Sequence, residues 1–134
     1  MSQDSLIKLG IVIPCYNEEQ VLEETIKSTL IALRELIFKQ KINADSRIYF
    51  VDDGSTDNTW EIIRKAAADN TEIRGLSLAH NAGHQNALLA GLIRAKESSD
   101  CVVSMDADLQ DDIEALEHFL DKHKEGYDVV YGVR

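Results

Sequence analysis

Apolar residues along this 134-residue chain follow two patterns that alternate with each other. Four uninterrupted apolar runs, rich in β-branched residues, are typical of strands buried on both faces, and a fifth run is weaker. The stretches between them repeat apolar residues at helical spacing. The predicted strands are 8–16, 46–54, 72–79 (the weaker one), 100–107 and 127–133.

The first predicted helix begins after Asn17, which stands three residues before Gln20 in the arrangement of a capping box. Further helices are predicted at about 58–69 and 84–98, and another follows residue 107. The apolar stripe expected to be buried on the first helix consists of Leu22, Ile26, Leu30, Leu33 and Ile37.

Strands that alternate with helices of this length predict an α/β fold, with a mainly parallel sheet and helices on both faces. No repeat, linker or low-complexity segment divides the chain, so residues 1–134 are expected to form one domain. The last predicted strand has no helix after it to cover it. We therefore expect the chain to be the N-terminal part of a longer protein, truncated at its C-terminal end.

The net charge of the chain limits the kinds of ligand that it is expected to bind. Fourteen Lys and Arg residues stand against 24 acidic residues, a formal net charge of −10. This balance argues against nucleic-acid binding, which requires a basic face. Any anionic ligand must therefore meet a bound cation or local backbone amides.

The sequence carries neither a membrane-spanning run nor a secretion signal. The chain contains no apolar run of about 18 residues that could span a bilayer. Its N-terminus lacks the basic segment and apolar segment of a secretion signal. Cys15 and Cys101 fall at opposite ends of their predicted strands, so no disulfide is expected, which fits a reducing cytoplasm.

Three acid-rich clusters follow predicted strands: "PCYNEE" after the first, "DDGSTD" after the second and "DADLQDD" after the fourth. The carboxyl ends of parallel strands meet at one edge, where open α/β sheets bind ligands. Each cluster alone is also typical of ordinary turn and cap residues. Three together favour a binding site.

The spacing of Asp106 and Asp108 indicates a metal site. Residues i and i+2 of an extended segment point to the same side, so both carboxylates can face one point. Two such charges repel by about 4 kcal/mol at 4 Å with an effective dielectric of 20, and a divalent cation reverses that repulsion. Mg²⁺ or Mn²⁺ prefers oxygen ligands and often adds substrate phosphates. Gln110 could add a carbonyl oxygen if the backbone stays extended.

Asp52 and Asp53 are adjacent, so in a strand they face opposite sides and only one can meet a ligand directly. A carboxylate only accepts hydrogen bonds, which suits the N–H edge of uracil or guanine. We expect Asp53 to contact the base and Asp52 to brace the loop. A pair of turn-stabilising aspartates is the alternative.

The motifs "VIPCYNEE", "VDDGSTDNT", "HNAGHQNALLAGL", "MDADLQD" and "YDVVYGVR", in this order over most of residues 8–134, resemble those of family 2 inverting glycosyltransferases with the GT-A fold. The branch they resemble most contains dolichol-phosphate mannose synthases and bacterial polyprenyl-phosphate glycosyltransferases. "DxD" alone would be a weak signal, but "DDGS" with "DADLQ" is specific.

The resemblance implies a UDP- or GDP-sugar donor, Mg²⁺ or Mn²⁺ as cofactor, and a polyprenyl-phosphate acceptor at the cytoplasmic face of a membrane. The motifs imply that the base and ribose are lined by Pro14, Tyr16, Glu18 and Asp53. Asp106 and Asp108 would hold the metal and diphosphate and carry the catalysis, with Ala107 between them and Gln110 as a further ligand.

The chain departs from this pattern in places. His80-Asn81 stands where many relatives carry Arg-Asn, which puts a diphosphate contact there in doubt. His84, near the start of a helix, is expected to be a surface histidine rather than a donor contact, and Cys15 is expected to be a core residue.

Other classes fit less well. A receiver-type signalling domain would carry its acid pair after the first strand, whereas the aspartate pairs here follow the second and fourth. A dinucleotide-binding oxidoreductase would carry G-x-G-x-x-G after the first strand. This chain has "PCYNEE" at that place. A non-catalytic nucleotide-sugar-binding or scaffold domain remains an alternative to the transferase.

Overall fold

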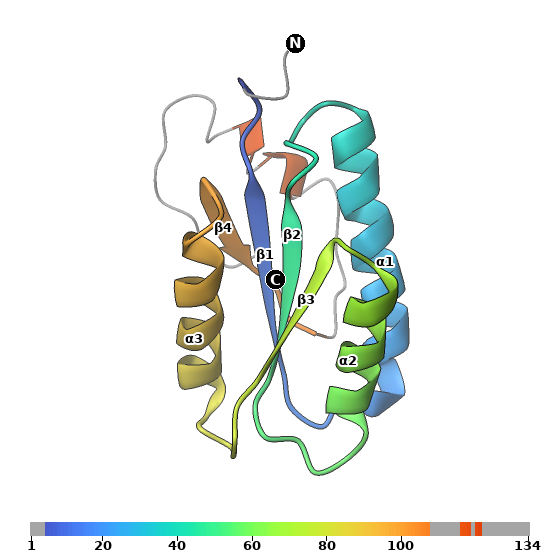
Figure 1. Ribbon diagram of the computed structural model, residues 1–134, viewed down its shortest axis with the longest axis vertical. Coiled ribbons are helices and arrows are strands. Elements are labelled where there is room, and N and C mark those ends of the chain that lie inside the picture. The colour runs from blue at the N-terminus through green and yellow to red at the C-terminus, as the bar shows by residue number, and fades with distance from the viewer. Residues whose placement is uncertain (1–4, 108–115, 119, 122–134) are drawn as a thin grey trace.

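The computed structural model describes residues 5–107, 116–118 and 120–121. Its sheet has four parallel strands in the order β3-β2-β1-β4 (Figure 1). The strands are β1 (Leu9–Cys15), β2 (Arg47–Asp52), β3 (Ile73–Ser77) and β4 (Cys101–Ser104). The predicted α/β class with a parallel sheet is confirmed. The predicted strand at 127–133 lies outside the described residues.

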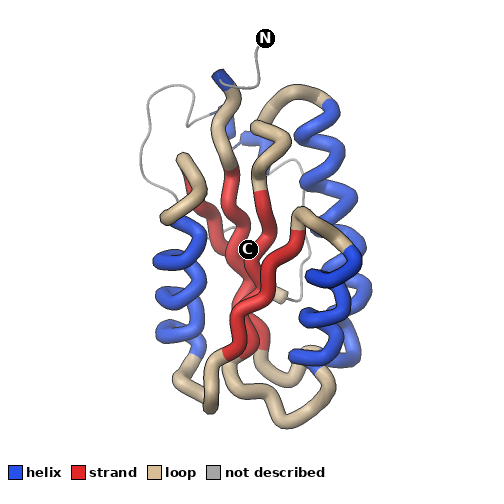
Figure 2. The backbone as a smooth tube through the Cα atoms, in the orientation of Figure 1, coloured by secondary structure: helices blue, strands red, loops and turns tan. Residues whose placement is uncertain are grey.

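Three helices of eight residues or more are described: α1 (Glu19–Phe38), α2 (Thr59–Asp69) and α3 (His84–Lys96). In Figures 1 and 2, α1 and α2 lie on one side of the sheet and α3 on the other. Residues 116–118 and 120–121 are also helical, as expected for the helix after residue 107. Both faces of the sheet are therefore covered, as predicted.

The larger core lies between α1, α2 and the sheet. Alternate residues of β1 face it, namely Leu9, Ile11 and Ile13, as the two-residue period of a strand requires. From α1, four of the five predicted positions are buried; Ile37 is only partly buried, and Leu36 is fully buried instead. Phe50, fully buried on β2, is the largest of these core side chains.

The smaller core lies under α3. Val12 and Val51 point to this face, and α3 meets them with small residues, Ala87, Gly91 and Ala95. A Cβ atom built on Gly91 would lie 2.8 Å from Val51 Cγ2 and nearer still to Val12 Cγ1. The backbone of α3 therefore lies closer to the sheet at Gly91 than a residue with a side chain would allow.

The strand order places a topological switch beside β1. The chain runs outward from β1 through β2 to β3, then crosses to the other side of β1 to form β4. Crossovers on both sides of one strand leave a crevice at its carboxyl end, where doubly wound sheets bind ligands. This order also differs from the 2-1-3-4-5 order of receiver domains, which argues against that alternative.

Candidate functional site

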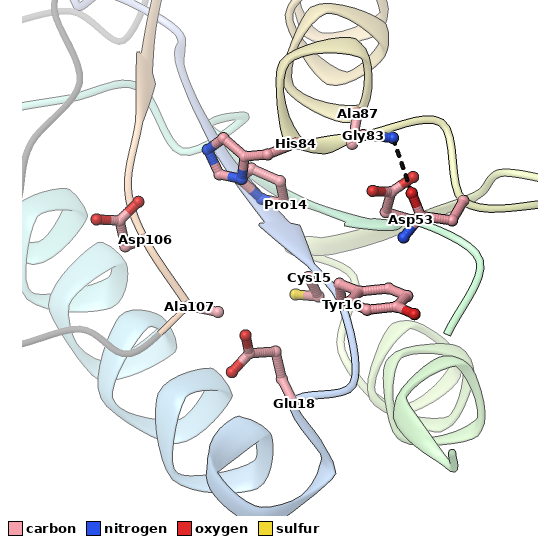
Figure 3. A pocket seen from close by; sticks show the side chains of 11 residues that line it. Pro14, Cys15, Tyr16, Glu18, Asp53, Gly83, His84, Ala87, Asp106 and Ala107 are labelled. Atoms are coloured by element: carbon pink, nitrogen blue, oxygen red, sulfur yellow. Dashed lines mark hydrogen bonds between the residues drawn. The ribbon is translucent and has the colours of Figure 1, made fainter. Parts of the chain in front are cut away.

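A cavity of about 440 Å³ opens at the carboxyl end of the sheet (Figure 3). Its walls come from the segment after β1, the segment after β2, the end of β4 and the start of α3. The lining residues are Pro14, Cys15, Tyr16, Glu18, Asp53, Asn81, Gly83, His84, Ala87, Asp106 and Ala107. All the strand ends that the sequence predicted to meet at one edge do so.

The cavity forms where β1 and β4 part. The last backbone bond between them joins Met105 N to Val12 O, at 2.9 Å. Pro14 lies beyond that bond, so its missing N–H leaves no bond to β4 unmade and a proline is tolerated in the central strand. Pro14 is buried and forms part of the cavity wall.

Tyr16 and Glu18 lie on either side of Asn17 in the loop after β1, and both line the cavity. Tyr16 is 44% exposed, whereas Glu18 is half-buried. In Figure 3 the ring of Tyr16 lies on the side of Asp53, and the carboxylate of Glu18 points toward Ala107.

The capping box predicted at Asn17 is wrong. The backbone of Asn17 is left-handed, with φ of 50°, and α1 begins two residues later with Glu18 as its N-cap. The Asn17 carboxamide oxygen accepts hydrogen bonds from Thr56 N at 2.9 Å and Thr56 Oγ1 at 3.3 Å. The Asn17 side chain, which the local pattern assigned to capping the helix, is therefore bonded to a residue 39 positions away.

The two adjacent aspartates at the end of β2 point to different places, as expected. Asp52 closes the strand, does not line the cavity, and its Oδ1 accepts a long hydrogen bond of 3.4 Å from Ser55 N. Asp53 lines the cavity, and its Oδ1 accepts a 2.7 Å bond from Ala82 N. Both side chains are 3% exposed. Contact of Asp53 with a base stays a prediction.

Asp106 and Ala107 bring the end of β4 into the cavity. The Ala107 carbonyl accepts a hydrogen bond from Thr25 Oγ1 of α1, which fixes the backbone directly after Asp106. Asp108 and Gln110, the other predicted metal ligands, lie outside the described residues. Within those residues, no group of three or more His, Cys, Asp or Glu side chains could hold a metal ion.

Sequence reasoning missed the α3 side of the cavity. Asn81, Gly83 and His84 all line it; His84 is exposed, as expected of a surface histidine, and lines the cavity as well. Gly83 has φ of 95°, and its N–H donates to Asn81 Oδ1 at 3.1 Å, the bond dashed in Figure 3. The sequence signal for this side of the cavity was Gly83, a glycine directly before a helix that begins at the edge where the strands end.

Cys15 is a core residue, as expected, and also part of the cavity floor. Burial raises the pKa of its thiol far above the ordinary value, and the charges of Glu18 and Asp52 raise it further. The thiol therefore stays protonated and unreactive at neutral pH. Cys15 and Cys101 are both free and buried, in agreement with the expectation of no disulfide.

The electrostatics of the cavity are one-sided. Glu18, Asp53 and Asp106 reach it from three different strand ends. Of the described lining residues, only His84 has a side chain that can carry a positive charge. An anionic ligand entering this cavity would be repelled unless a cation entered with it.

A parallel sheet with an acidic cavity at its switch point is the arrangement of a doubly wound α/β domain, which binds its ligands in this crevice. The sequence profile described as Glycosyl transferase family 2 matches residues 10–134, and the chain belongs to that family. Membership excludes the receiver-type alternative.

Relatives of similar sequence are also named glycosyltransferases. The chain is 52% identical over 126 residues to the uncharacterized glycosyltransferase YkoT of Bacillus subtilis, covering 94% of this chain and 37% of YkoT. It is 39% identical over 128 residues to the uncharacterized glycosyltransferase YkcC of the same organism, covering 96% of this chain and 37% of YkcC. The chain thus spans little more than a third of these relatives.

Solved structures share the fold. S. aureus TarS 1-349 in complex with UDP-GlcNAc matches with a TM-score of 0.63 and 26% identity, over 87% of this chain and 32% of that one. The mannosyltransferase PcManGT from Pyrobaculum calidifontis, in complex with GDP-Man and Mn²⁺, matches with a TM-score of 0.61 and 23% identity, over 87% and 32%. At that identity the second likeness shows the fold alone.

Proposed function

We propose that this chain is the donor-binding part of an inverting glycosyltransferase that moves a sugar from a UDP- or GDP-sugar to a polyprenyl phosphate. Family membership supports the transferase class. The fold neighbour of higher identity, TarS, is in complex with UDP-GlcNAc, which supports a nucleotide-sugar donor. The acceptor is inferred from the resemblance of the motifs alone.

The single observation that carries the proposal is the shared cavity. Carboxylates from three strand ends, Glu18, Asp53 and Asp106, line one space of about 440 Å³. That volume suits a small-molecule ligand with a few orienting polar groups. In the proposed pose the base lies by Tyr16 and Asp53, and the diphosphate lies toward Asp106.

The residues present fit a divalent cation. Asp106 is half-buried at the cavity wall and offers the hard oxygen ligand that Mg²⁺ and Mn²⁺ prefer. Such ions commonly use one or two protein carboxylates and take further ligands from substrate phosphates. When bound, the ion would neutralise the charge on the departing diphosphate.

The proposed transfer reaction needs few further catalytic groups from the protein. An oxygen of the acceptor phosphate attacks the anomeric carbon, the carbon–diphosphate bond breaks on the opposite face, and the nucleoside diphosphate leaves. Because that phosphate is already ionised near neutral pH, no strong general base is needed. The residues of the cavity hold and orient the donor, and positioning supplies much of the rate.

We further propose that the whole protein works at the cytoplasmic face of a membrane, where polyprenyl phosphates are available. No helix in the described part of the chain is both long and apolar enough to cross a bilayer. We propose that residues outside this chain provide the membrane association.

Titration calorimetry with UDP, GDP and ADP, with and without Mn²⁺, tests the proposal. We expect Mn²⁺-dependent binding of UDP or GDP and weaker binding of ADP. Asp106→Ala should weaken the Mn²⁺-dependent binding about 100-fold, the upper end of the effect of groups that order a metal site. Asp45→Ala, at a side chain 69% exposed outside the cavity lining, is the matched control and should bind normally.

Equal, metal-independent affinity for all three nucleotides, unaffected by Asp106→Ala, would contradict the proposal. Transfer of labelled sugar to a polyprenyl phosphate by the full-length protein then separates an enzyme from a scaffold. Donor binding without turnover would support the scaffold alternative.

A further inference from the structure

The starts of α1 and α2 cap each other. Neither helix is capped by the side chain of its own N-cap residue. Instead Glu19 N donates to Asp57 Oδ2 and Asn58 N donates to Glu19 Oε2, both at 3.3 Å. Free N–H groups at a helix start need such acceptors, so each helix start supplies what the other lacks.

Thr59 lies at the centre of this arrangement. It is the first residue of α2 and fully buried. Its hydroxyl donates to Asp57 Oδ1 at 2.5 Å and accepts from Glu18 N at 2.8 Å. A hydroxyl has one hydrogen to donate. When the Thr59 hydroxyl donates it to Asp57, the lone pairs of Oγ1 face the N–H of Glu18.

The charge of Asp57 fixes this orientation. Burial works to raise the pKa of its carboxyl, but the hydrogen bonds from the Thr59 side chain and backbone, and from Glu19, hold the pKa below its ordinary value. Asp57 is therefore ionised at neutral pH and can only accept. The Thr59 hydroxyl cannot reverse and donate elsewhere without losing this bond.

The hydrogen bonds that run from Asp57 through Thr59 end at Glu18. Its backbone N–H meets Thr59, it is the N-cap of α1, and its side chain lines the cavity. Left-handed Asn17 stands directly before it, and Asn17 N donates to Ser55 Oγ at 2.9 Å. The backbone that carries Glu18 is thus held by Ser55 of the β2–α2 loop and by Thr59 at the start of α2.

We infer that Thr59 is a positioning residue for the donor site: its hydroxyl, oriented by Asp57, sets the place of Glu18 in the cavity. The inference rests on the proposed function, because it presumes that Glu18 lines a nucleotide-sugar site. Thr59 itself does not line the cavity. It acts through the backbone of Glu18.

Three variants test the inference by calorimetry with UDP or GDP plus Mn²⁺. Thr59→Val keeps the shape and removes the hydroxyl, and should weaken binding about tenfold, the effect of one lost hydrogen bond to a placed group. Thr59→Ser restores the hydroxyl and should bind within about twofold of the wild type, well inside the range of one hydrogen bond. Thr29→Val makes the same change at a buried threonine whose hydroxyl, within the described part of the chain, donates to Thr25 O of α1 at 2.7 Å, and should not change binding.

A double-mutant cycle separates positioning from general stability. If Thr59 acts through Glu18, then Thr59→Val should have little further effect on affinity in a Glu18→Gln background. A helix-capping role alone would lower the unfolding midpoint in both backgrounds and leave affinity for the folded protein unchanged. If Thr59→Val does not fold, Asp57→Asn takes its place, since it weakens the acceptor that orients the hydroxyl.

The results of these titrations distinguish a failure of the proposed function from a failure of the positioning inference. If the wild type binds neither UDP nor GDP, the proposed function fails. If the wild type binds and Thr59→Val binds equally well, only the positioning inference fails. An equal loss of affinity in the wild-type and Glu18→Gln backgrounds also overturns it, because Thr59 would then act by another route.

Discussion

Two parts of the cavity wall are held in very different ways. The loops after β1 and β2 are joined by several hydrogen bonds, including Asn17 N to Ser55, Thr56 N to Asn17 and Glu18 N to Thr59. In the loop after β3, residues 79–82 are exposed. Two hydrogen bonds link this loop to the β2 end, from Leu78 N and Ala82 N to the two aspartates.

The difference separates a fixed side of the site from an adjustable one. Tyr16, Glu18 and Asp53 are placed before any ligand arrives, so little ordering free energy is lost when a ligand binds. Asn81 and His84 lie on the side with few bonds to the rest of the protein, the kind of segment that opens at low free energy. We expect ligand binding to move the second side more than the first.

Gly54 is where the two sides touch, and Gly54→Ala should have the largest effect on stability. Its φ is 68°, and an added Cβ would lie 2.5 Å from the His80 carbonyl carbon and closer to Asn81 N. Left-handed strain and overpacking against backbone together predict a loss of about 2–4 kcal/mol in the free energy of unfolding. Urea denaturation measures it.

Gly83→Ala is the matched control for that variant. Its φ is 95°, but nothing lies within 4 Å of an added Cβ. Only the backbone strain remains, about 1–3 kcal/mol for the essentially glycine-only region that its φ of 95° and ψ of 150° define. Equal losses for the two variants would show that the contact between the two sides does not contribute.

Asn17→Gly tests the bonded side with a smaller expected effect. Glycine keeps the left-handed conformation, so the change removes only the bonds to Thr56. The free energy of unfolding should therefore fall by about 1 kcal/mol. Gln40, also left-handed with φ of 57°, is the control. Gln40→Gly should be neutral or stabilising, since it relieves strain in the turn after α1. A neutral Asn17→Gly would mean that the loops hold together without this side chain.

The smallest effect is expected far from the cavity, at the ion pair of Arg34 and Glu72, whose Nε and Oε2 atoms are 2.8 Å apart. Glu72→Gln should lower stability at pH 7 by about 0.5 kcal/mol, the usual value for a partly exposed pair. The hydrogen bond from Arg34 lowers the pKa of Glu72 below 4.5, despite burial. The stabilisation is therefore full above pH 4.5 and is lost as pH falls through the folded pKa.

Urea titrations from pH 7 to pH 3 check this sign. The gap in unfolding free energy between wild type and Glu72→Gln should stay constant above pH 4.5 and close below it. A gap that widens in acid would rule out the ion pair as its cause.

Sequence reasoning predicted the fold because the strands are buried on both faces and the helices have clear apolar stripes. It also placed Pro14, Tyr16, Glu18, Asp53 and Asp106 at one edge, since parallel strands bring their carboxyl ends together. These predictions depend only on local periodicity and on a topological rule.

It failed where partners lie far apart in the chain. Asn17 has the local pattern of a helix cap, yet Thr56 holds its side chain. Gly91 of α3 lies close against Val12 and Val51 of the sheet, another contact between segments far apart in the chain. Local patterns carry no information about such contacts.

The close approach at Gly91 has one more consequence. Because α3 rests almost directly on Val12 and Val51, the height of its first residue above the strands is set by a position that has no side chain. Even one methyl group there would tilt or lift α3 and carry His84 with it. The width of the binding space could thus be varied from beneath the helix, without a change to any residue that a ligand touches.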